Sequence, residues 1–244
     1  PTTLPSQYSF DDYDGIIVAG GDGTINALMQ SIVQSNLPLG IIPIGSINIL
    51  ARELSIPISL ESACQRIIDG NLTYIDIGSV NNRYFTTMLG AGLDATVIKQ
   101  TPLSLKKIFG LFSYGIILIK CLFLYRFYPI TVSLDNDTVC TAYYVLIGNS
   151  KYYAGSYNVF PKATIDDGLL DIFLLTKPGF WRIFRAIWNL LFNTLDQNSD
   201  VKFFQSKHIQ LRSSTPQHLH IDAEYLGHTP AIISIKSKAI AIFC

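Results

Sequence analysis

Gly20-Gly21-Asp22-Gly23-Thr24 decides the fold, because this glycine-rich stretch joins an apolar run to a segment with helical spacing. The apolar run, residues 15–19, reads as a buried strand, and residues 25–33 have the apolar periodicity of a helix. Glycines let the backbone approach a ligand closely, so that successive N–H groups can converge on an anion. The positive N-terminal end of the following helix also favours an anion. The stretch therefore predicts a phosphate-binding loop in an α/β nucleotide-binding fold.

The carboxylate inside this loop needs an explanation of its own. Asp22 is out of place beside phosphate groups unless a cation lies between them, and Mg²⁺, held directly or through water, resolves the conflict. Thr24 is expected to cap the N-terminus of the helix. The alternative is a tight strand–helix turn that needs glycine for packing alone. Packing would account for the glycines but not for Asp22.

A second loop repeats this pattern between another strand and another helix. Residues 39–44 read as a buried strand, Gly45 follows, and residues 49–54 read as a helix that stops before a proline. Ser46 is expected to cap that helix or to offer its hydroxyl to a phosphate, and Asn48 is the alternative structural tie. Two such loops from neighbouring parallel strands would form a crevice at the carboxyl ends of the sheet, where α/β proteins bind ligands.

The pattern of predicted secondary structure changes at about residue 75, and this change predicts two domains. After a third helix over 62–69, short strand-like runs separated by turns predominate, which suggests a sandwich or barrel. Two helical insertions interrupt them, near 104–125 and 178–194. We therefore predict an α/β nucleotide-binding domain over residues 1–77 and a β-sandwich-like domain with helical insertions over residues 78–244.

Composition narrows the class of ligand. Hydrophobic residues make up 49% of the chain and charged residues only 15%, against about 25% charged residues in a typical soluble domain. The surplus predicts a large core, an apolar ligand pocket or a face that touches a membrane. The net charge is zero and no long basic run occurs, which disfavours a nucleic-acid partner. The four cysteines form no Cys-x-x-Cys pair, so a reduced, cytoplasmic compartment is expected.

Two oily segments fit a lipid partner. Residues 108–124 are almost continuously apolar, but Lys120 within them would cost about 2.5–3.5 kcal/mol at a bilayer centre, so we expect a helix over an apolar cavity or against lipid rather than a membrane span. In the other segment, residues 180–188, three aromatic side chains share one helical stripe and two arginines border it. This pattern suits an interfacial helix or a core-packing helix, and the residues alone leave both open.

Segments along most of the chain resemble the diacylglycerol kinase catalytic-domain family of lipid kinases, which includes the bacterial soluble diacylglycerol kinases, their YegS-like relatives and the sphingosine kinases. The GGDG string alone also occurs in NAD kinases and phosphofructokinases, whereas residues 161–171 (PKATIDDGLLD) are more specific to the lipid kinases. The matching segments are GGDGTIN (20–26), PIGSINILAREL (43–54), IDIG (75–78), LGAGLDA (89–95), KKIFGLFSY (106–114), GNSKYYAGSYNVFPKATIDDGLLD (148–171) and Asp222-Ala223-Glu224.

The resemblance implies a phosphofructokinase- and NAD-kinase-like nucleotide-binding domain, followed over residues 78–244 by a β-rich, sandwich-like, lipid-binding domain. It also implies an enzyme that uses ATP and Mg²⁺ to phosphorylate a lipid hydroxyl, with a role in phospholipid metabolism. The carboxylate that ends the Asp-x-Glu motif, here Glu224, would be the base, supported by Asp222. A structural Mg²⁺ would be held by Asp167 and the main-chain carbonyls of Thr164 and Leu169. The implied nucleotide-binding residues are Gly20, Gly21, Asp22, Gly23, Thr24, Asn26 and Ser46.

The chain departs from the family pattern in three places. The second loop has Gly45-Ser46 where the family usually has Gly-Thr, which keeps the hydroxyl. Ala223 stands where the family usually has glycine, and alanine adopts positive φ less easily. Family members also begin with a further strand–helix–strand and an Asn-Pro-x-Ser-Gly-like segment, so we expect the N-terminal part of the nucleotide-binding domain to be missing from this sequence.

Three functions follow as alternatives. The first is a lipid kinase at the cytoplasmic face of the inner membrane, with a lipid substrate, peripheral membrane contact and an acceptor such as diacylglycerol or a related lipid. The second is a catalytically weak lipid- or nucleotide-binding protein on the same fold. The third, an NAD-kinase-type enzyme, would leave the oily helices unexplained. The sequence leaves open the acceptor lipid, the choice between ATP and GTP, and whether the chain forms a homodimer.

Overall fold

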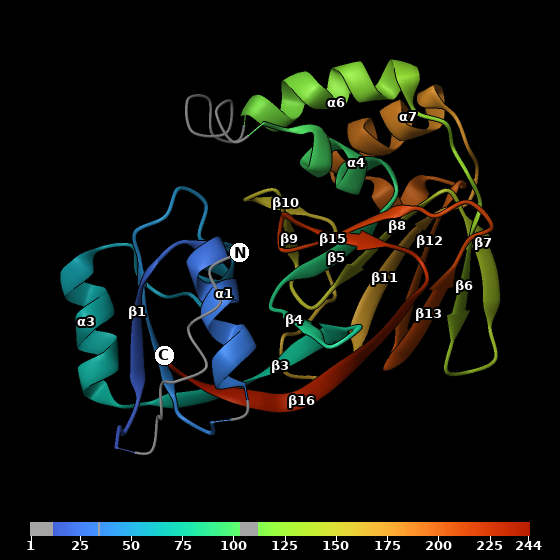
Figure 1. Ribbon diagram of the computed structural model, residues 1–244. Coiled ribbons are helices and arrows are strands. Elements are labelled where there is room, and N and C mark those ends of the chain that lie inside the picture. Colours follow the sequence, from blue (N-terminus) through green and yellow to red (C-terminus); the bar gives the residue numbers. More distant parts are fainter. Residues whose placement is uncertain (1–11, 34, 103–111) are drawn as a thin grey trace.

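The computed structural model describes residues 12–33, 35–102 and 112–244, which form two lobes (Figure 1). The predicted helix near 104–125 therefore lies partly outside the described residues. The helices are α1 (Asp22–Ile32), α2 (Ile49–Glu53), α3 (Leu60–Asp69), α4 (Leu93–Gln100), α6 (Phe112–Leu124), α7 (Phe180–Leu191) and a short 3₁₀ turn, η1 (Leu195–Gln197). The strands are β1 (Ile16–Gly20), β2 (Leu39–Pro43), β3 (Leu72–Val80), β4 (Arg83–Phe85), β5 (Met88–Ala91), β6 (Ile130–Leu134), β7 (Val139–Ala142), β8 (Tyr144–Gly148), β9 (Tyr152–Tyr153), β10 (Tyr157–Asn158), β11 (Leu170–Leu175), β12 (Val201–Ser206), β13 (His208–Arg212), β14 (His218–Ile221), β15 (Glu224–His228) and β16 (Ala231–Phe243).

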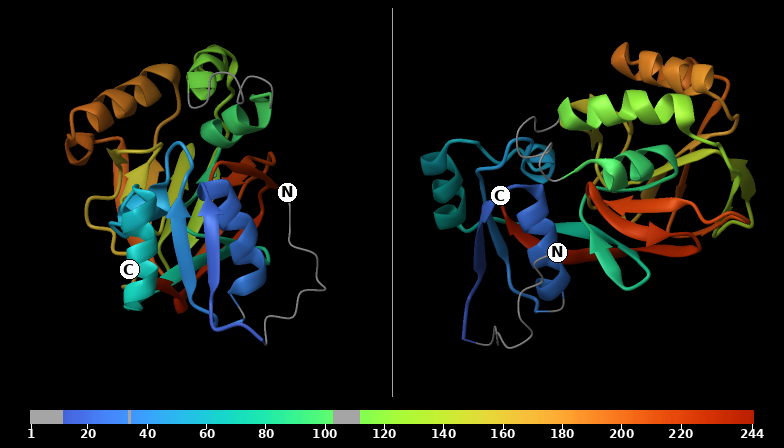
Figure 2. Two further views of the ribbon diagram at one scale, coloured as in Figure 1. Left: turned by 90° about the vertical axis from the view of Figure 1, so that its left-hand side faces the viewer. Right: turned by 45° about the horizontal axis from the view of Figure 1, so that its top comes forward.

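The N-terminal lobe is the predicted α/β unit. Strands β1 and β2 are parallel, with Ile16 opposite Leu39, and α1 makes the crossover between them. Helices α1 and α3 lie on opposite sides of these strands (Figures 1 and 2). Apolar side chains such as Ile25 and Met29 on α1 are completely buried between helix and sheet, and this burial holds the glycine loop at the top of β1.

The C-terminal strand β16 ties the two lobes together. Along its length it pairs with β13 and with β3, and at its end Ile242 lies opposite Leu39 of β2 in parallel orientation. Among the described residues this gives one sheet of eight strands, with the order β1-β2-β16-β13-β6-β7 and with β3 and β4 attached through β16. Because β3 and β16 run through both lobes, the division into domains at residue 77 stays a prediction.

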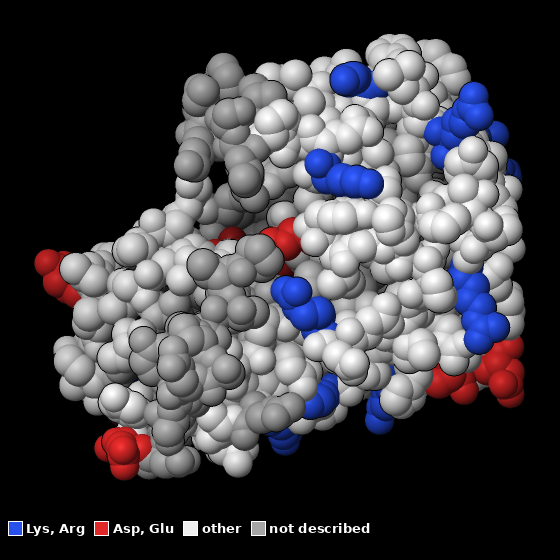
Figure 3. Space-filling view, viewed as in Figure 1, with Lys and Arg blue, Asp and Glu red and all other residues white. Residues whose placement is uncertain are grey.

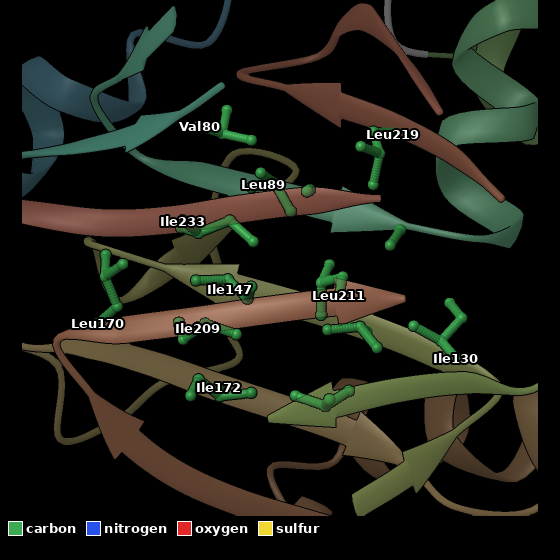
Figure 4. Packing of buried hydrophobic residues seen from close by; sticks show 14 of the residues in the cluster. Val80, Leu89, Ile130, Ile147, Leu170, Ile172, Ile209, Leu211, Leu219 and Ile233 are labelled. Carbon is green, nitrogen blue, oxygen red and sulfur yellow. The ribbon is translucent and has the colours of Figure 1, made fainter. Parts of the chain in front are cut away.

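The C-terminal lobe is a sandwich of two sheets. A second sheet of six described strands, in the order β12-β11-β8-β5-β14-β15, faces the first one. Alternate side chains such as Ile209 and Leu211 of β13 point into the space between the sheets, and Ile147 and Ile172 meet them from the other side (Figure 4). The family resemblance predicts this β-rich sandwich, and the structure confirms it.

Helices cover the outer face of the six-stranded sheet. Helices α4, α6 and α7 lie together at the top of Figure 1. Every residue of β11 is buried, because one face of this strand meets the other sheet and the opposite face meets the helical layer. A cavity of about 270 Å³ lies between the helices and the sheet. Across the described part of the chain, no helix combines the length and the apolar character that a bilayer span needs.

Two local sequence predictions are wrong, and one helix was missed. Helix α1 begins at Asp22, with Gly21 as its N-cap, so Thr24 lies within the first turn and caps nothing. Asn48, not Ser46, is the N-cap of α2, and Ser46 is an exposed loop residue. Helix α4 was not predicted, because its alternating small and polar residues carry little helical periodicity.

A glycine in β3 tests the contact between this strand and the sandwich core. A Cβ added to Gly78 would lie 2.1 Å from the ring of Phe85, which is completely buried. We expect Gly78→Ala to lower the free energy of unfolding by about 1–3 kcal/mol, as overpacking does. The matched control is Gly115→Ala, because no described atom lies within 4 Å of that added Cβ, and alanine there should stabilise α6 by up to about 1 kcal/mol. If urea denaturation showed the same change in unfolding free energy for both variants, the close contact between Gly78 and Phe85 would be contradicted.

Candidate functional site

The two glycine loops touch each other at the carboxyl ends of β1 and β2. A Cβ on Gly45 would lie 2.4 Å from the Cα of Gly21, so no side chain fits at Gly45. Asn48 fixes the second loop: its Oδ1 accepts a hydrogen bond from the Gly45 N–H (3.1 Å), and its Nδ2 donates to the Gly45 carbonyl (2.7 Å). Asn48 is thus the structural tie, and close packing explains part of the glycine content.

The loop also presents unpaired backbone donors. Within the described residues, no hydrogen bond engages the N–H groups of Gly21, Asp22 and Gly23, and no side chain caps α1. The N-terminal N–H groups of a helix together with its dipole form an anion-binding site. The geometry therefore suits phosphate oxygens in front of Gly21–Gly23.

Glu224 faces this loop from the other lobe. Its Oε1 lies 3.9 Å from the position that a Cβ on Gly23 would occupy. No hydrogen bond joins the Glu224 side chain to another described residue, so its oxygens are available to a ligand. The fold thus brings together two predicted site residues that are about 200 positions apart in the chain. Figure 3 shows the hollow between the lobes, with acidic side chains inside it.

Asp222, the other predicted catalytic carboxylate, is instead saturated with protein contacts. Its Oδ1 accepts hydrogen bonds from the Thr87 N–H (3.0 Å), the Thr87 hydroxyl (2.7 Å) and the Met88 N–H (2.9 Å). Its Oδ2 accepts from the Thr86 N–H (2.8 Å), the Thr86 hydroxyl (3.0 Å) and the Asn26 side-chain amide. The side chain therefore joins α1 to the segment before β5 and has no oxygen lone pair to spare for a substrate.

Asp222 and Glu224 do not lie on the same strand, although they are only two residues apart in the chain. Asp222 and Ala223 form a two-residue turn between β14 and β15, with φ angles of 44° and 62°. Positive φ at both positions is the pattern of a type I′ hairpin turn. Ala223 therefore adopts the left-handed conformation in which glycine has no steric cost, and the turn aims the two carboxylates at different targets.

The Asp22 carboxylate has a partner that sequence reasoning missed. Its Oδ1 accepts a hydrogen bond from the Leu50 N–H (3.3 Å) at the start of α2. Burial raises the pKa of Asp22, the backbone N–H groups of α2 oppose that shift, and the charge of Asp222 adds to it. A partly buried carboxylate that faces both a second carboxylate and a phosphate-binding loop suits a divalent cation, so Asp22 fits the implied Mg²⁺.

Asp167 lies in a second group of carboxylates, away from the glycine loops. Its Oδ1 accepts from the Leu169 N–H (2.9 Å), while the nearby, fully buried Asp76 accepts from the Gly168 N–H and the Lys238 N–H. Partial burial raises the pKa of Asp167, and the charges of Asp76 and Asp166 add to the rise. These oxygens fit a hard cation.

In the described part of the chain, however, no three His, Cys, Asp or Glu side chains are grouped to hold a metal. A set with one carboxylate and the carbonyls of Thr164 and Leu169 stays a prediction. Sequence reasoning quoted Asp76 only as part of a motif and missed its role, which is to hold the turn at Gly168 and the bulge at Lys238.

A buried polar group, also missed, borders the cavity under α7. Asp94 Oδ2 lies 2.8 Å from His220 Nε2 and accepts a hydrogen bond from the Tyr144 hydroxyl (3.1 Å). Burial raises the pKa of Tyr144 and of Tyr153, and the Asp94 charge raises both further. The rest of the cavity wall is almost wholly apolar and includes Phe173, Ile183, Ala186 and Leu190. One polar end and an apolar body match the chemistry of a lipid.

Comparison with known proteins places both halves of the chain. The model of the diacylglycerol kinase catalytic domain matches residues 2–80, and that of the YegS C-terminal NAD kinase beta sandwich-like domain matches residues 87–244. Three curated relatives bear the name diacylglycerol kinase. That of Staphylococcus epidermidis is 32% identical over 95% of this chain and 74% of its own length. The relative from Staphylococcus saprophyticus is 31% identical over 99% of this chain and 80% of its own length. The relative from Staphylococcus haemolyticus is 34% identical over 90% of this chain and 68% of its own length.

Solved structures agree with the fold. A crystal structure described as a diacylglycerol kinase from Bacillus anthracis has a TM-score of 0.76 and 26% identity, and the match covers 96% of this chain and 78% of that one. Another structure from the same organism has a TM-score of 0.79 and 24% identity, with 96% and 77% covered. The combination of α/β lobe and sandwich is therefore shared with experimentally determined proteins.

The different surroundings of the two carboxylates can be tested by stability. We expect Asp222→Ala to lower the free energy of unfolding by about 3 kcal/mol or more, because it leaves several buried donors without a partner. Glu224→Ala is the matched control, because Glu224 directly follows the turn as the first residue of β15, and it should cost less than about 1 kcal/mol. Urea denaturation followed by circular dichroism measures both. Similar losses for the two variants would contradict the assignment of Asp222 as the structural anchor.

Proposed function

The chain belongs to the diacylglycerol kinase catalytic-domain family of lipid kinases, and from this membership we propose that it transfers the γ-phosphate of ATP to a lipid hydroxyl, on diacylglycerol or a related lipid. The observation that carries the proposal is the free carboxylate of Glu224 beside Gly23 of the phosphate loop. A phosphate donor bound at the loop would meet an acceptor hydroxyl beside that carboxylate.

The step needs alignment and a proton acceptor more than it needs covalent help from the protein. The acceptor oxygen attacks the γ-phosphorus, and the bond from this phosphorus to the oxygen that bridges it to the β-phosphate breaks. The acceptor proton passes to the Glu224 carboxylate. Asp222 acts as a positioning residue, because its hydrogen bonds to Asn26, Thr86 and Thr87 hold α1 and the β14–β15 turn at a fixed separation.

The proposal includes Mg²⁺ with the nucleotide. Bound there, the ion would neutralise phosphate charge, and Asp22 is the residue that would hold it. The Asp22 carboxylate is already oriented by the Leu50 N–H, and the unpaired N–H groups of Gly21–Gly23 would bind phosphate oxygens. Asp167, with Thr164 and Leu169, would hold a second ion whose role is to stiffen a loop.

The acceptor's apolar part is proposed to enter the cavity under α4, α6 and α7. Its volume of about 270 Å³ is less than twice that of an engineered cavity of about 150 Å³ that holds one benzene. The cavity can therefore take one acyl chain, or part of one, and leave the remainder of a two-chain lipid outside. The pair of strands β5 and β14 runs from the polar end of this cavity to the Asp222 turn.

Peripheral membrane contact is proposed through α7. Trp181, Phe184 and Trp188 are 75%, 48% and 55% exposed, which is unusual for large aromatic side chains outside an interaction surface. Arg182 is held in an ion pair with Asp200, which leaves Arg185 as the arginine of this helix that can reach a lipid headgroup. Aromatic residues at this density suit the interfacial region of a bilayer.

Glu224→Gln tests the proposed base. We expect the parent chain, in mixed micelles with Mg²⁺, to transfer labelled phosphate from ATP to diacylglycerol, monoacylglycerol, ceramide or sphingosine. The rate of phosphate transfer by the variant should fall by about 100-fold or more, which is the typical effect of removing a general base. Its affinity for ATP should stay unchanged. Glu61→Gln, on the far helix α3, is the matched control and should keep full activity. A parent chain that binds ATP but labels no lipid would favour the binding-protein alternative.

Ala186→Phe tests the acceptor cavity. Ala186 lines the cavity and is 9% exposed, so a phenyl group there would fill space intended for an acyl chain. We expect KM for the lipid to rise by about tenfold or more, since loss of a well-filled apolar contact costs about 1–3 kcal/mol, while KM for ATP stays unchanged. An unchanged KM for lipid, in a variant with normal thermal stability, would place the acceptor elsewhere.

A further inference from the structure

A second groove, on the other side of the helical layer, shares no lining residue with the acceptor cavity. It has a volume of about 300 Å³ and lies between α4, the C-terminal end of α6, residues 125–128 and residues 215–218. Its wall is held in place by internal hydrogen bonds. The Tyr125 hydroxyl donates to Gln217 Oε1 (3.2 Å), and the buried Gln217 donates through Nε2 to the Thr215 carbonyl (2.8 Å).

The groove is positively charged. Lys120 and Arg126 both line it, His218 lines it as well, and no Asp or Glu does. Neither Lys120 nor Arg126 has an ion-pair partner among residues 12–33, 35–102 and 112–244. Lys99 lies next to the groove, over the ring of Tyr225 at 5.2 Å. Figure 3 shows Lys and Arg, without Asp or Glu, over the upper part of this face.

The neutral lining groups can also bind an anion. Thr96, Gln100, Tyr128 and Thr215 contribute hydroxyl and amide groups to the wall. A phosphate group in such a groove would receive charge-assisted hydrogen bonds from Lys120 and Arg126 and ordinary ones from these side chains. Burial lowers the pKa of His218, and the charges of Lys99 and His228 lower it further, so a bound anion would offset the crowding of positive groups.

Exposed apolar side chains flank Lys120 on α6. Ile119, Phe123 and Leu124 are 61%, 73% and 72% exposed, and Lys120 lies among them in sequence. Basic residues that alternate with exposed apolar residues on a helix suit a surface where phosphate groups and acyl chains meet. Free phosphate would gain only the polar contacts of the groove and would leave this apolar face uncovered, so we expect it to bind much more weakly than a lipid.

We propose that the Lys120–Arg126 groove binds the phosphate of an anionic phospholipid headgroup while the exposed face of α6 contacts the acyl chains. The site is separate from the proposed acceptor cavity and does not depend on the kinase reaction. It would hold the protein on an anionic membrane with α7 and α6 facing the bilayer, so that the acceptor cavity between them opens toward its substrate.

Vesicle sedimentation tests the site without measuring catalysis. The full chain would be mixed with phosphatidylcholine vesicles that contain 0% or about 20% phosphatidic acid, and we expect binding only to the anionic vesicles. The double variant Lys120→Ala/Arg126→Ala should bind them about 30-fold more weakly, the effect of two basic residues at an anionic surface. The charge-matched control Lys202→Ala/Lys207→Ala, at exposed positions of β12 and the following turn, should lose less than about threefold.

Two further arms separate a groove from a diffuse patch and a lipid from free phosphate. Thr215→Trp fills the groove without changing charge and should also weaken vesicle binding. Inorganic phosphate at millimolar concentration should neither compete with the vesicles nor raise the thermal stability of the parent chain. Equal binding by the double variant and its control would overturn the proposal. Stabilisation by phosphate alone, with vesicle binding unchanged in the double variant, would overturn the lipid assignment in favour of a soluble anion.

Discussion

The candidate site depends on one buried carboxylate. Asp222 accepts hydrogen bonds from α1 and from the segment between β4 and β5, elements that lie 134–196 positions away in sequence. A buried carboxylate without these donors would be strongly destabilising, so the two lobes must keep the separation at which all of them are satisfied. The same constraint forces the left-handed turn at Asp222-Ala223 and thereby points Glu224 at the glycine loop.

The architecture extends this local constraint to the whole molecule. Strand β16 passes from the sandwich into the N-terminal lobe, and its pairing with β2 fixes the lobe that carries the phosphate loop. The other sheet carries a helical layer, with the proposed acceptor cavity beneath it and the basic groove on its far side. The proposed sites for nucleotide, acceptor and membrane thus lie on separate surfaces, with the Asp222-Ala223 turn at one end of β14 and the basic groove at the other.

The local parts of this account could be predicted from sequence, and the non-local parts could not. The periodicity of residues 15–33 alone predicts a strand, a glycine turn and a helix. The parallel pairing of β1 with β2 follows from that pattern. The partners of Asp22 and Asp76, and half of those of Asp222, are backbone N–H groups, which carry no sequence signal. Ala223 also misled, because only the tertiary hydrogen bonds of its neighbour reveal that the turn tolerates a positive φ there.

A crystal structure with a non-hydrolysable ATP analogue and Mg²⁺ would test the central claim most directly. The account predicts that the phosphates lie against the N–H groups of Gly21–Gly23, with the γ-phosphate facing the Glu224 carboxylate and with the Asp222 contacts unchanged. Phosphates bound away from this loop would contradict it. So would a structure in which Asp222 leaves its threonine partners to contact the nucleotide or metal, because that residue would then be a ligand and not the anchor.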